Sequence, residues 1–330
     1  MLLSVVIPVY NEEQVIDLLL ARLKETLDGL DCEYEVLFVD DGSKDNTYEI
    51  LRRAGANDRR IKALSFSRNF GHQMAITAGL DFAAGDAVVV MDADLQDPPE
   101  LLKPMLALFQ RGYDIVSPQR VRRQSESFFK RITARWFYLL MRRAVDARLQ
   151  PEVGDFRLMS SRVVAALRSL REQHRFMRGM VASLGFKEAL IPFEREARAA
   201  GETKYPLRKM LRFAWTAVTS FSGMPLRVAV GAGLLIAAGG VVYLGYTLYV
   251  AFIAHEVVPG WSSLVVLQCI FSGSILVTVG LVGDYIARIY EEVKGRPLYV
   301  VQAALNITNA PAVHRAFFET RTYAEKAQIE

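Results

Sequence analysis

The chain has 330 residues, 52% of them hydrophobic and 23% charged, which is enough to bury the core of one large domain with an appendage. Its 40 basic and 36 acidic residues give a net charge of +4, and no basic stripe with interleaved aromatic residues occurs, which argues against nucleic-acid binding. The distant cysteines Cys32 and Cys269 exclude a disulfide framework and a cysteine zinc site, and favour a reducing compartment.

Residues 1–120 alternate short β-branched runs with amphipathic helical patterns. We interpret the first run as a buried strand and not a signal peptide, because no basic region precedes it and a proline soon follows. The alternation predicts a mostly parallel sheet with helices on both faces. The expected strands lie within 3–10, 34–43, 61–67, 86–100 and 113–120, and the expected helices within 12–27, 45–56, 72–83 and 100–112.

Residues 121–145 are basic and aromatic, with apolar positions near helical spacing. A helix packed on the core and an interfacial helix that faces anionic headgroups both fit this pattern. Lys130 and Arg131 belong to its basic set.

Two long runs without charged residues follow an amphipathic segment at 207–222. The runs 228–254 and 257–283 each exceed the roughly 20 residues that a helix needs to cross a bilayer, and a short break with Pro259 and Gly260 separates them. Basic residues flank the pair but are absent from the connection, so the positive-inside rule places both ends in the cytoplasm. We expect a catalytic domain at 1–206, a juxtamembrane segment at 207–227, a membrane hairpin at 228–290 and a cytoplasmic tail at 291–330.

The strongest local signal is the pair Asp92 and Asp94 after the run VVVM. Two carboxylates at i and i+2, where a strand ends, can bind one cation. Mg²⁺ and Mn²⁺ prefer oxygen ligands, and Mg²⁺ in particular is commonly bound by one or two carboxylates plus substrate phosphates. The pattern predicts a divalent metal that neutralises a departing diphosphate, with Gln96 close by.

Polar residues also end the first two strands. Asp41, in Asp40-Asp41-Gly42-Ser43, is placed to hydrogen-bond a nucleoside at the carboxyl edge of the sheet, although this string also fits a helix N-cap. The first strand ends with Pro8, Tyr10, Asn11 and Glu12, which we include in the candidate nucleotide site.

The strings VVIPVYNEE, VDDGSKD, SRNFGHQMA and MDADLQDPPE, in this order and spacing, resemble the inverting family 2 glycosyltransferases of GT-A fold. The later strings GDFRLMSSRVV, HRFMRGMV, RAAGETKYPLRKML and GDYIARIYEEVKGRPLYVVQ resemble the bactoprenol subgroup of the polyprenyl-phosphate glycosyltransferases, which also include dolichol-phosphate mannose synthases. The resemblance covers roughly residues 3–302 and implies an α/β GT-A domain with interface helices and two C-terminal membrane helices.

The resemblance also implies roles for single residues. Pro8, Tyr10, Glu12 and Asp41 match nucleoside contacts, Asp92 and Asp94 match the metal and diphosphate motif, and Gln96 lies beside the donor. Asp155 matches the proposed catalytic acidic residue, with Arg157 beside it, and Arg120, Arg198 and Lys204 resemble basic residues near the phosphates. Ala134 replaces an acceptor-side serine of the mannose synthases, which weakens the transfer of acceptor contacts from that subgroup.

The implied reaction transfers a sugar, with UDP as the expected carrier and glucose as an example, to undecaprenyl or another polyprenyl phosphate at a bacterial inner membrane. The lipid phosphate is already anionic near neutral pH, so a strong general base is less necessary. We therefore expect Asp155 to orient the acceptor site or its arginine neighbours, although a turn-capping role also fits it. His72 and His174 receive no role, and homo-oligomers such as tetramers are expected from the subgroup.

Two other functions deserve comparison. A processive polysaccharide synthase of this fold would carry a Q-x-x-R-W motif and more membrane spans, but here Arg135-Trp136 has no glutamine three residues before the arginine. A non-catalytic membrane scaffold would be marked by loss of the paired acids, and Asp92 and Asp94 are intact.

Overall fold

The computed structural model describes residues 1–120, 150, 153–193, 223–249, 253 and 260–307. The chain divides into two compact units. One contains Met1–Arg142, Asp146–Tyr205 and Pro297–Glu330, and the other contains Arg143–Val145 and Pro206–Arg296. The predicted amphipathic helices at 121–145 and 207–222, and the candidate residues Lys130, Arg131, Arg198 and Lys204, lie outside the described residues.

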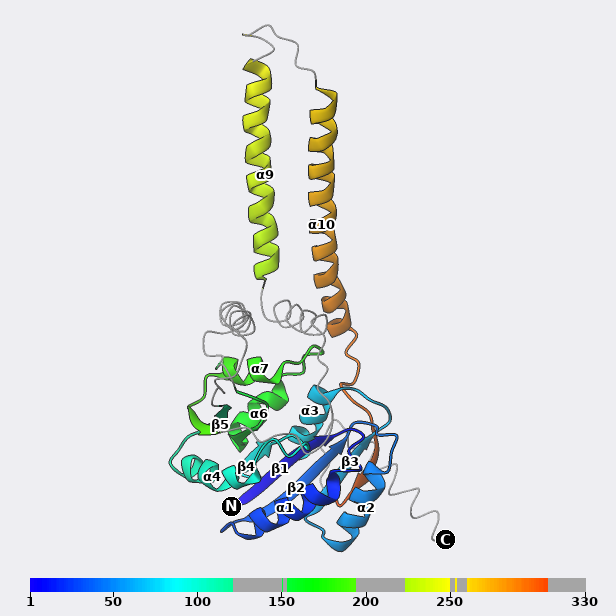
Figure 1. Cartoon of the computed structure of the whole chain (residues 1–330), viewed down its shortest axis with the longest axis vertical. Coiled ribbons are helices and arrows are strands. Elements are labelled where there is room, and N and C mark those ends of the chain that lie inside the picture. Colours follow the sequence, from blue (N-terminus) through cyan, green and yellow to red (C-terminus); the bar gives the residue numbers. More distant parts are fainter. Residues whose placement is uncertain (121–149, 151–152, 194–222, 250–252, 254–259, 308–330) are drawn as a thin grey trace. The chain divides into compact units, whose positions relative to one another are not determined.

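The described part of the first unit is built on one eight-stranded sheet, in the order β7-β5-β6-β4-β1-β2-β3-β8. Figure 1 labels the strands β1 to β5 of this sheet. Its β-branched and aromatic runs form the strands β1 (Leu2–Val9), β2 (Glu33–Asp40), β3 (Ile61–Phe66), β4 (Ala87–Val90), β5 (Ile115–Arg120), β6 (Arg157–Ser160), β7 (Glu188–Phe193) and β8 (Val301–Leu305). The five strands expected from the sequence are all present, and the α/β fold with a mostly parallel sheet is confirmed.

The sheet is mixed at two places that the strand–helix alternation did not reveal. β6 lies between β4 and β5 and is antiparallel to both. β8 is antiparallel to β3 at the edge of the sheet. The other pairs, β1 with β2 and β4, β2 with β3, and β5 with β7, are parallel, so β1, β2 and β4 end at one shared edge.

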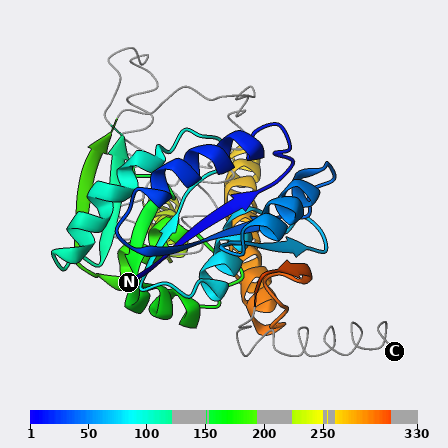
Figure 2. The ribbon, with the colours of Figure 1, turned by 90° about the horizontal axis from the view of Figure 1, so that it is seen from below.

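Helices cover both faces of this sheet (Figure 2). α1 (Ile16–Asp28), α2 (Thr47–Asn57) and α4 (Leu102–Gln110), which follows the short 3₁₀ helix η1 (Pro99–Leu101), pack on the face that buries Leu3, Val5 and Phe38. α3 (His72–Phe82) packs on the other face against Leu37 and Val39, followed by α6 (Ser161–Ser169) and α7 (Met177–Leu184). Alternate residues of each strand therefore pack on different helices, as the period of a strand requires.

Gly79 allows α3 to lie close to β1. A Cβ atom at this position would be 2.1 Å from Cγ1 of Val6, whose side chain is fully buried and stiff at χ1. We expect Gly79→Ala to lower the free energy of unfolding by about 1 kcal/mol or more, because overpacking outweighs the gain in helix propensity. Denaturant unfolding of the variant measures this change, and equal or increased stability would contradict it.

The chain after residue 296 returns to the eight-stranded sheet of the first unit. Residues from Pro297 onward belong to the first unit, and β8 pairs with β3 from Val301 to Leu305. Tyr299, just before β8, is 1% exposed. The sequence had indicated only a polar tail here, because a five-residue strand with partly exposed residues carries little periodic signal.

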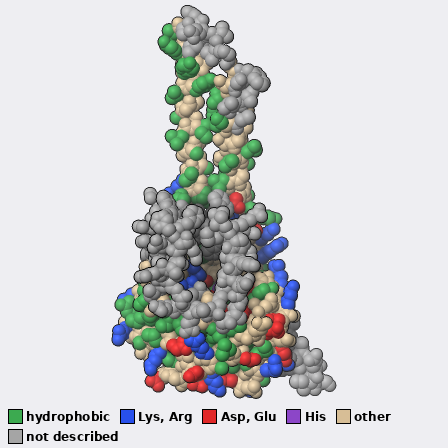
Figure 3. Space-filling view, viewed as in Figure 1, with side chains coloured by type: hydrophobic (Ala, Val, Ile, Leu, Met, Phe, Trp, Pro, Cys, Tyr) green, Lys and Arg blue, Asp and Glu red, His purple; other side chains and the backbone are tan. Residues whose placement is uncertain are grey.

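The second unit contains two long apolar helices, α9 (Met224–Tyr249) and α10 (Trp261–Val293). The 26 residues of α9 extend about 39 Å, and the segments Met224–Tyr249 and Ile270–Val293 are long and apolar enough to cross a membrane. No residue of the described α9 is buried, and hydrophobic side chains are exposed along both helices (Figure 3). These two apolar helices are the ones that the sequence predicted at 228–254 and 257–283.

Candidate active site

A cavity of about 420 Å³ opens where β1, β2 and β4 end and α3 begins. This volume falls within the usual range for small-molecule sites, roughly 300–1,000 Å³. Its walls carry six of the residues predicted from the sequence, namely Pro8, Tyr10, Glu12, Asp41, Asp92 and Asp94, together with Val9, Asn69, Gly71, His72, Ala75 and Ala93. The structure therefore brings the ends of three separate strands into one polar cavity.

Asp41 organises the loop that leads into α3. Its Oδ1 accepts a hydrogen bond of 2.6 Å from the Phe70 amide, and its Oδ2 accepts one of 2.9 Å from the Gly71 amide. Burial raises the pKa of Asp41 despite these two bonds. Gly42, with φ at 71°, lets the next turn approach the backbone of Arg68, where any Cβ would clash. Asp41 is thus both a wall of the cavity and the anchor of its neighbouring loop.

Asn11 and Gln96 do not line the cavity. Asn11 adopts φ of 55° and joins two turns, since its amide donates to Ser43 Oγ and its Oδ1 accepts from the Lys44 amide. Gln96 is 7% exposed, and its backbone amide donates to Asp94 Oδ1 over 3.1 Å. Their predicted contacts with the nucleotide stay predictions, and in this structure both shape the turns that carry other cavity residues.

The loop after β4 concentrates carboxylates. The Asp92 amide donates to Oδ2 of Asp97 over 3.2 Å, and Leu95 adopts a φ of 60° within the same turn. Burial raises the pKa of Asp97 to about 7, and the charge of Asp92 adds to this effect. Burial likewise raises the pKa of Asp92, where the charges of Asp155 and Asp94 add to it and that of His72 opposes it. Burial and neighbouring acids thus disfavour the ionised forms of both Asp92 and Asp97.

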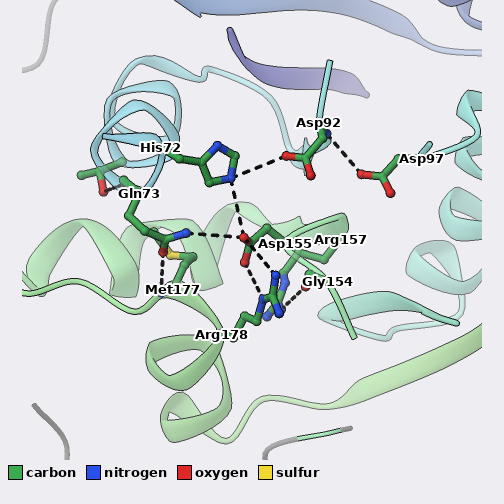
Figure 4. A network of polar contacts seen from close by, with 10 residues as sticks. His72, Gln73, Asp92, Asp97, Gly154, Asp155, Arg157, Met177 and Arg178 are labelled. Carbon is green, nitrogen blue, oxygen red and sulfur yellow. Dashed lines mark hydrogen bonds and ion pairs between the residues drawn. The ribbon is translucent and has the colours of Figure 1, made fainter. Parts of the chain in front are cut away.

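Asp155 lies at the centre of a polar network that reaches the cavity (Figure 4). Arg178, in α7, donates to Asp155 Oδ1 over 3.0 Å and to Oδ2 over 3.4 Å. Gln73 Nε2 donates to Asp155 Oδ2 over 3.4 Å, while its Oε1 accepts from the Met177 amide. Burial favours the neutral acid, but Arg178 and His72 outweigh it and hold the pKa of Asp155 well below its usual range. Asp155 is therefore an ionised, firmly held carboxylate.

His72 connects Asp155 to the acidic loop. Its Nε2 lies 3.5 Å from Asp92 Oδ1 and 3.6 Å from Asp155 Oδ2. Burial alone would lower the pKa of His72, but the negative charges of the nearby Asp155 and Asp92 raise it. No role was predicted for His72 from the sequence, and Arg178 was not among the predicted site residues. Both could have been found, since His72 follows the third strand at the same sheet edge and Arg178 lies in the string HRFMRGMV.

Arg157 and Arg120 lie beside this network. Arg157 is 3% exposed, donates to the Gly154 carbonyl over 2.8 Å, and lines a small second cavity with Arg178 and Glu188. Its Nε and that of Arg120 are the buried arginine atoms near the network that have no hydrogen-bond partner among the described residues. Burial lowers the pKa of Arg157, and the charges of Asp155 and Glu188 oppose this. Arg157, the predicted neighbour of Asp155, is thus close to it, but Asp155 forms its ion pair with Arg178.

The carboxylates of the cavity suit a divalent cation. Asp92 and Asp94 both face the cavity, and Oδ1 of the buried Asp97 behind them has no hydrogen-bond partner among the described residues. Within those residues, no group of three or more acidic, histidine or cysteine side chains could hold a metal ion. The protein would supply two carboxylates, and a bound diphosphate would have to supply further oxygens, which is the usual arrangement for Mg²⁺.

Comparison with known proteins agrees with this geometry. Residues 4–168 match the model of glycosyl transferase family 2. The chain is 48% identical over 306 residues to the "Uncharacterized glycosyltransferase YkcC" of Bacillus subtilis, covering 93% of this chain and 95% of that one. It is 37% identical over 302 residues to the "Prophage bactoprenol glucosyl transferase homolog" of Escherichia coli, with 92% and 99% covered, and 38% identical to the "SfII prophage-derived bactoprenol glucosyl transferase" of Shigella flexneri, with 92% and 98% covered. The chain therefore belongs to glycosyl transferase family 2 and is a glycosyltransferase, as its ordered motifs predicted.

Proposed function

We propose that this glycosyltransferase moves a sugar from a UDP-sugar to undecaprenyl phosphate, or a related polyprenyl phosphate, at the membrane surface. The observation that carries the proposal is the cavity that joins Asp41 to Asp92 and Asp94. The names of the bactoprenol glucosyl transferases, which are similar over nearly their full length, support a polyprenyl acceptor and make glucose the first sugar to test. The product would serve the modification of cell-envelope glycans.

The donor nucleotide would occupy the part of the cavity near Asp41. A carboxylate at the carboxyl end of a strand can accept an N–H of the base or a ribose hydroxyl. Asp41 already accepts two backbone amides, but a carboxylate offers about four lone-pair positions and retains acceptor capacity. Pro8 and Tyr10, on the neighbouring strand end, would contact the nucleoside from the other side.

Asp92 and Asp94 would hold Mg²⁺ or Mn²⁺ against the diphosphate. When bound, the metal supplies Lewis-acid stabilisation of the negative charge that develops on the leaving group. The two carboxylates would hold the ion in position, and the hydrogen bond that the Asp92 amide donates to Asp97 Oδ2 keeps the turn in shape. A bound cation would offset the charges of the acids that this loop brings together.

The transfer needs two anions to meet. An oxygen of the lipid phosphate attacks the anomeric carbon, the bond from that carbon to the diphosphate oxygen breaks, and the electron pair leaves with the nucleoside diphosphate, so configuration inverts. Arginines lower the repulsion between the two anions because their forked N–H groups bind phosphate oxygens. We assign this role to Arg157 and Arg178, which are close to Asp155, and to Arg120, whose guanidinium is close to Gly154. The further predicted contacts are Arg198, Lys204, Lys130 and Arg131.

The two apolar helices would anchor the enzyme in a bacterial inner membrane. In this arrangement the catalytic domain and both termini face the cytoplasm, where UDP-sugars and the lipid phosphate meet. The basic residues that flank the hairpin in the sequence support this orientation. The domain boundaries at 206, 227 and 290 and a homo-oligomeric state, such as a tetramer, belong to the same proposal.

A panel of labelled nucleotide-sugars tests the reaction. We expect the full chain in detergent to transfer label from UDP-glucose, in preference to UDP-N-acetylglucosamine, UDP-galactose, UDP-aminoarabinose or GDP-mannose, into the lipid phase with undecaprenyl phosphate. EDTA should abolish transfer, and added Mg²⁺ or Mn²⁺ should restore it, because the acids need the metal to bind the diphosphate. NMR of the product determines the anomeric configuration. Absence of label in the lipid phase for every donor would refute the acceptor assignment.

A further inference from the structure

Tyr299 links the chain beyond the apolar hairpin to the catalytic domain. Helix α10 ends at Val293, and Tyr299 follows within six residues, at 1% exposure. Its ring lies in the hydrophobic cluster between the sheet and α3, together with Phe66 and Leu64. A tyrosine so deeply buried is held in a single position, and its neighbours are held by it.

Two aromatic contacts connect the ring of Tyr299 to the loop beside the cavity. It stacks on Phe66 at a centroid distance of 5.1 Å and an angle of 18°, and Phe66 in turn meets Phe70 edge-to-face at 5.7 Å. The Phe70 amide donates to Asp41. One residue on from Tyr299, the Val300 carbonyl accepts from the Ser67 amide over 3.1 Å. The loop Ser67–Gly71 is therefore fixed on one side by Asp41 and on the other by the segment around Tyr299.

The hydroxyl of Tyr299 contacts the C-terminal end of α3, the helix that follows this loop. It donates to Asp81 Oδ2 over 2.8 Å, and Arg171 donates to both carboxylate oxygens of Asp81 over 2.9 Å. Asp81 lies in the last turn of α3, whose first turn carries His72 and Gln73 to Asp155. Tyr299 thus contacts the end of α3 directly, at Asp81, and is connected to the loop before α3 through Phe66.

We infer that Tyr299 is a positioning residue for the donor: its ring, stacked on Phe66, holds the loop Ser67–Gly71 in the conformation in which Asp41, Asn69 and Gly71 form the nucleotide end of the cavity. The inference rests on the proposed assignment of that cavity to the donor. It makes donor affinity depend on the segment that follows the second apolar helix, although Tyr299 itself does not line the cavity.

Two variants separate the ring from the hydroxyl. Tyr299→Leu removes the stack on Phe66, and Tyr299→Phe keeps it while losing the bond to Asp81. The matched control is Tyr34→Leu, which also loses a ring and a tyrosine–aspartate bond, from Tyr34 to Asp28 at 2.5 Å, but at the start of β2, the opposite end of that strand from the cavity. All three are compared with the wild type as full chains, by UDP titration calorimetry with Mn²⁺, by steady-state kinetics, and by hydrogen exchange without nucleotide.

For Tyr299→Leu we expect the Kd for UDP and the donor KM to rise about tenfold with kcat unchanged, since a disordered loop must be reordered before binding. Its Phe70 and Gly71 amides should exchange faster than in the wild type, while the amides of β1 and β2 should keep their wild-type exchange rates. Tyr299→Phe should restore most of the affinity, and Tyr34→Leu should keep the wild-type Kd.

Wild-type values of Kd and of loop exchange in Tyr299→Leu would overturn the inference, as would faster exchange spread evenly over the domain. Failure of wild-type protein to bind UDP or GDP would instead refute the donor assignment of the cavity. In that case the exchange of the Phe70 and Gly71 amides, measured without nucleotide, still decides whether Tyr299 holds the loop.

Discussion

Asp92→Asn and Asp94→Asn should each lower kcat by about a hundredfold or more in a protein that remains folded. Both side chains line the cavity, and burial raises the pKa of Asp92, with the charge of Asp94 adding to this effect. An asparagine keeps the shape of the side chain but loses the charge that binds a divalent cation. The developing charge on the diphosphate then lacks its main compensation, so the loss falls on the chemical step.

The measurement is transfer of labelled sugar into lipid, at saturating donor, over a titration of Mn²⁺. Asp86→Asn is the matched control, because Asp86 precedes β4 while Asp92 follows it, and its carboxylate accepts the Leu2 amide over 2.9 Å. An asparagine oxygen can accept that bond equally well, so this variant should be as active as the wild type. Near-normal turnover in both Asp92→Asn and Asp94→Asn would refute the metal role of the pair.

The meeting of Asp41, Asp92 and Asp94 could be predicted because it follows from local patterns and one topological rule. Each acid follows a β-branched run, and parallel strands end at the same edge of their sheet. The order of the strands did not need to be known, since any arrangement of parallel neighbours would place these ends on one edge. The prediction therefore depended only on the alternation of strands and helices.

Asp155 reaches the same edge by a different route. β6 is antiparallel to β4, and Arg157 pairs with Val90, so the residues before β6 lie beside those that follow β4. Strand pairing between such distant segments depends on tertiary contacts, and the four-residue β6 has no periodic signal strong enough to predict it. The position of Asp155 was therefore available only through the family resemblance. Arg178 lies in one of the resembling strings, but its ion pair with Asp155 could not be predicted.

The direction of the pKa of Asp155 leads to a prediction about pH. Because Arg178 and His72 hold this pKa well below its usual range, the carboxylate is ionised at every pH above that depressed value. We therefore expect no titration of Asp155 in the kcat profile between about pH 5 and pH 9. Replacing Arg178 by glutamine removes the stabilising charge, so the pKa of Asp155 must rise and an acid limb should appear in the profile.

The activities of Asp155 and Arg178 variants should show that these two residues act as a unit. We expect Asp155→Asn and Arg178→Gln each to reduce kcat by about a hundredfold with little change in donor KM, since neither side chain lines the donor cavity. The double variant should be hardly worse than either single one, because each removes the same ion pair. Arg162→Gln, which breaks the ion pair with Asp114 elsewhere in the domain, serves as the control and should keep its kcat. Additive losses would show that Asp155 and Arg178 act independently and not as an ion pair. An Asp155→Asn enzyme with full activity would show that Asp155 only caps its turn and takes no part in orienting the lipid phosphate.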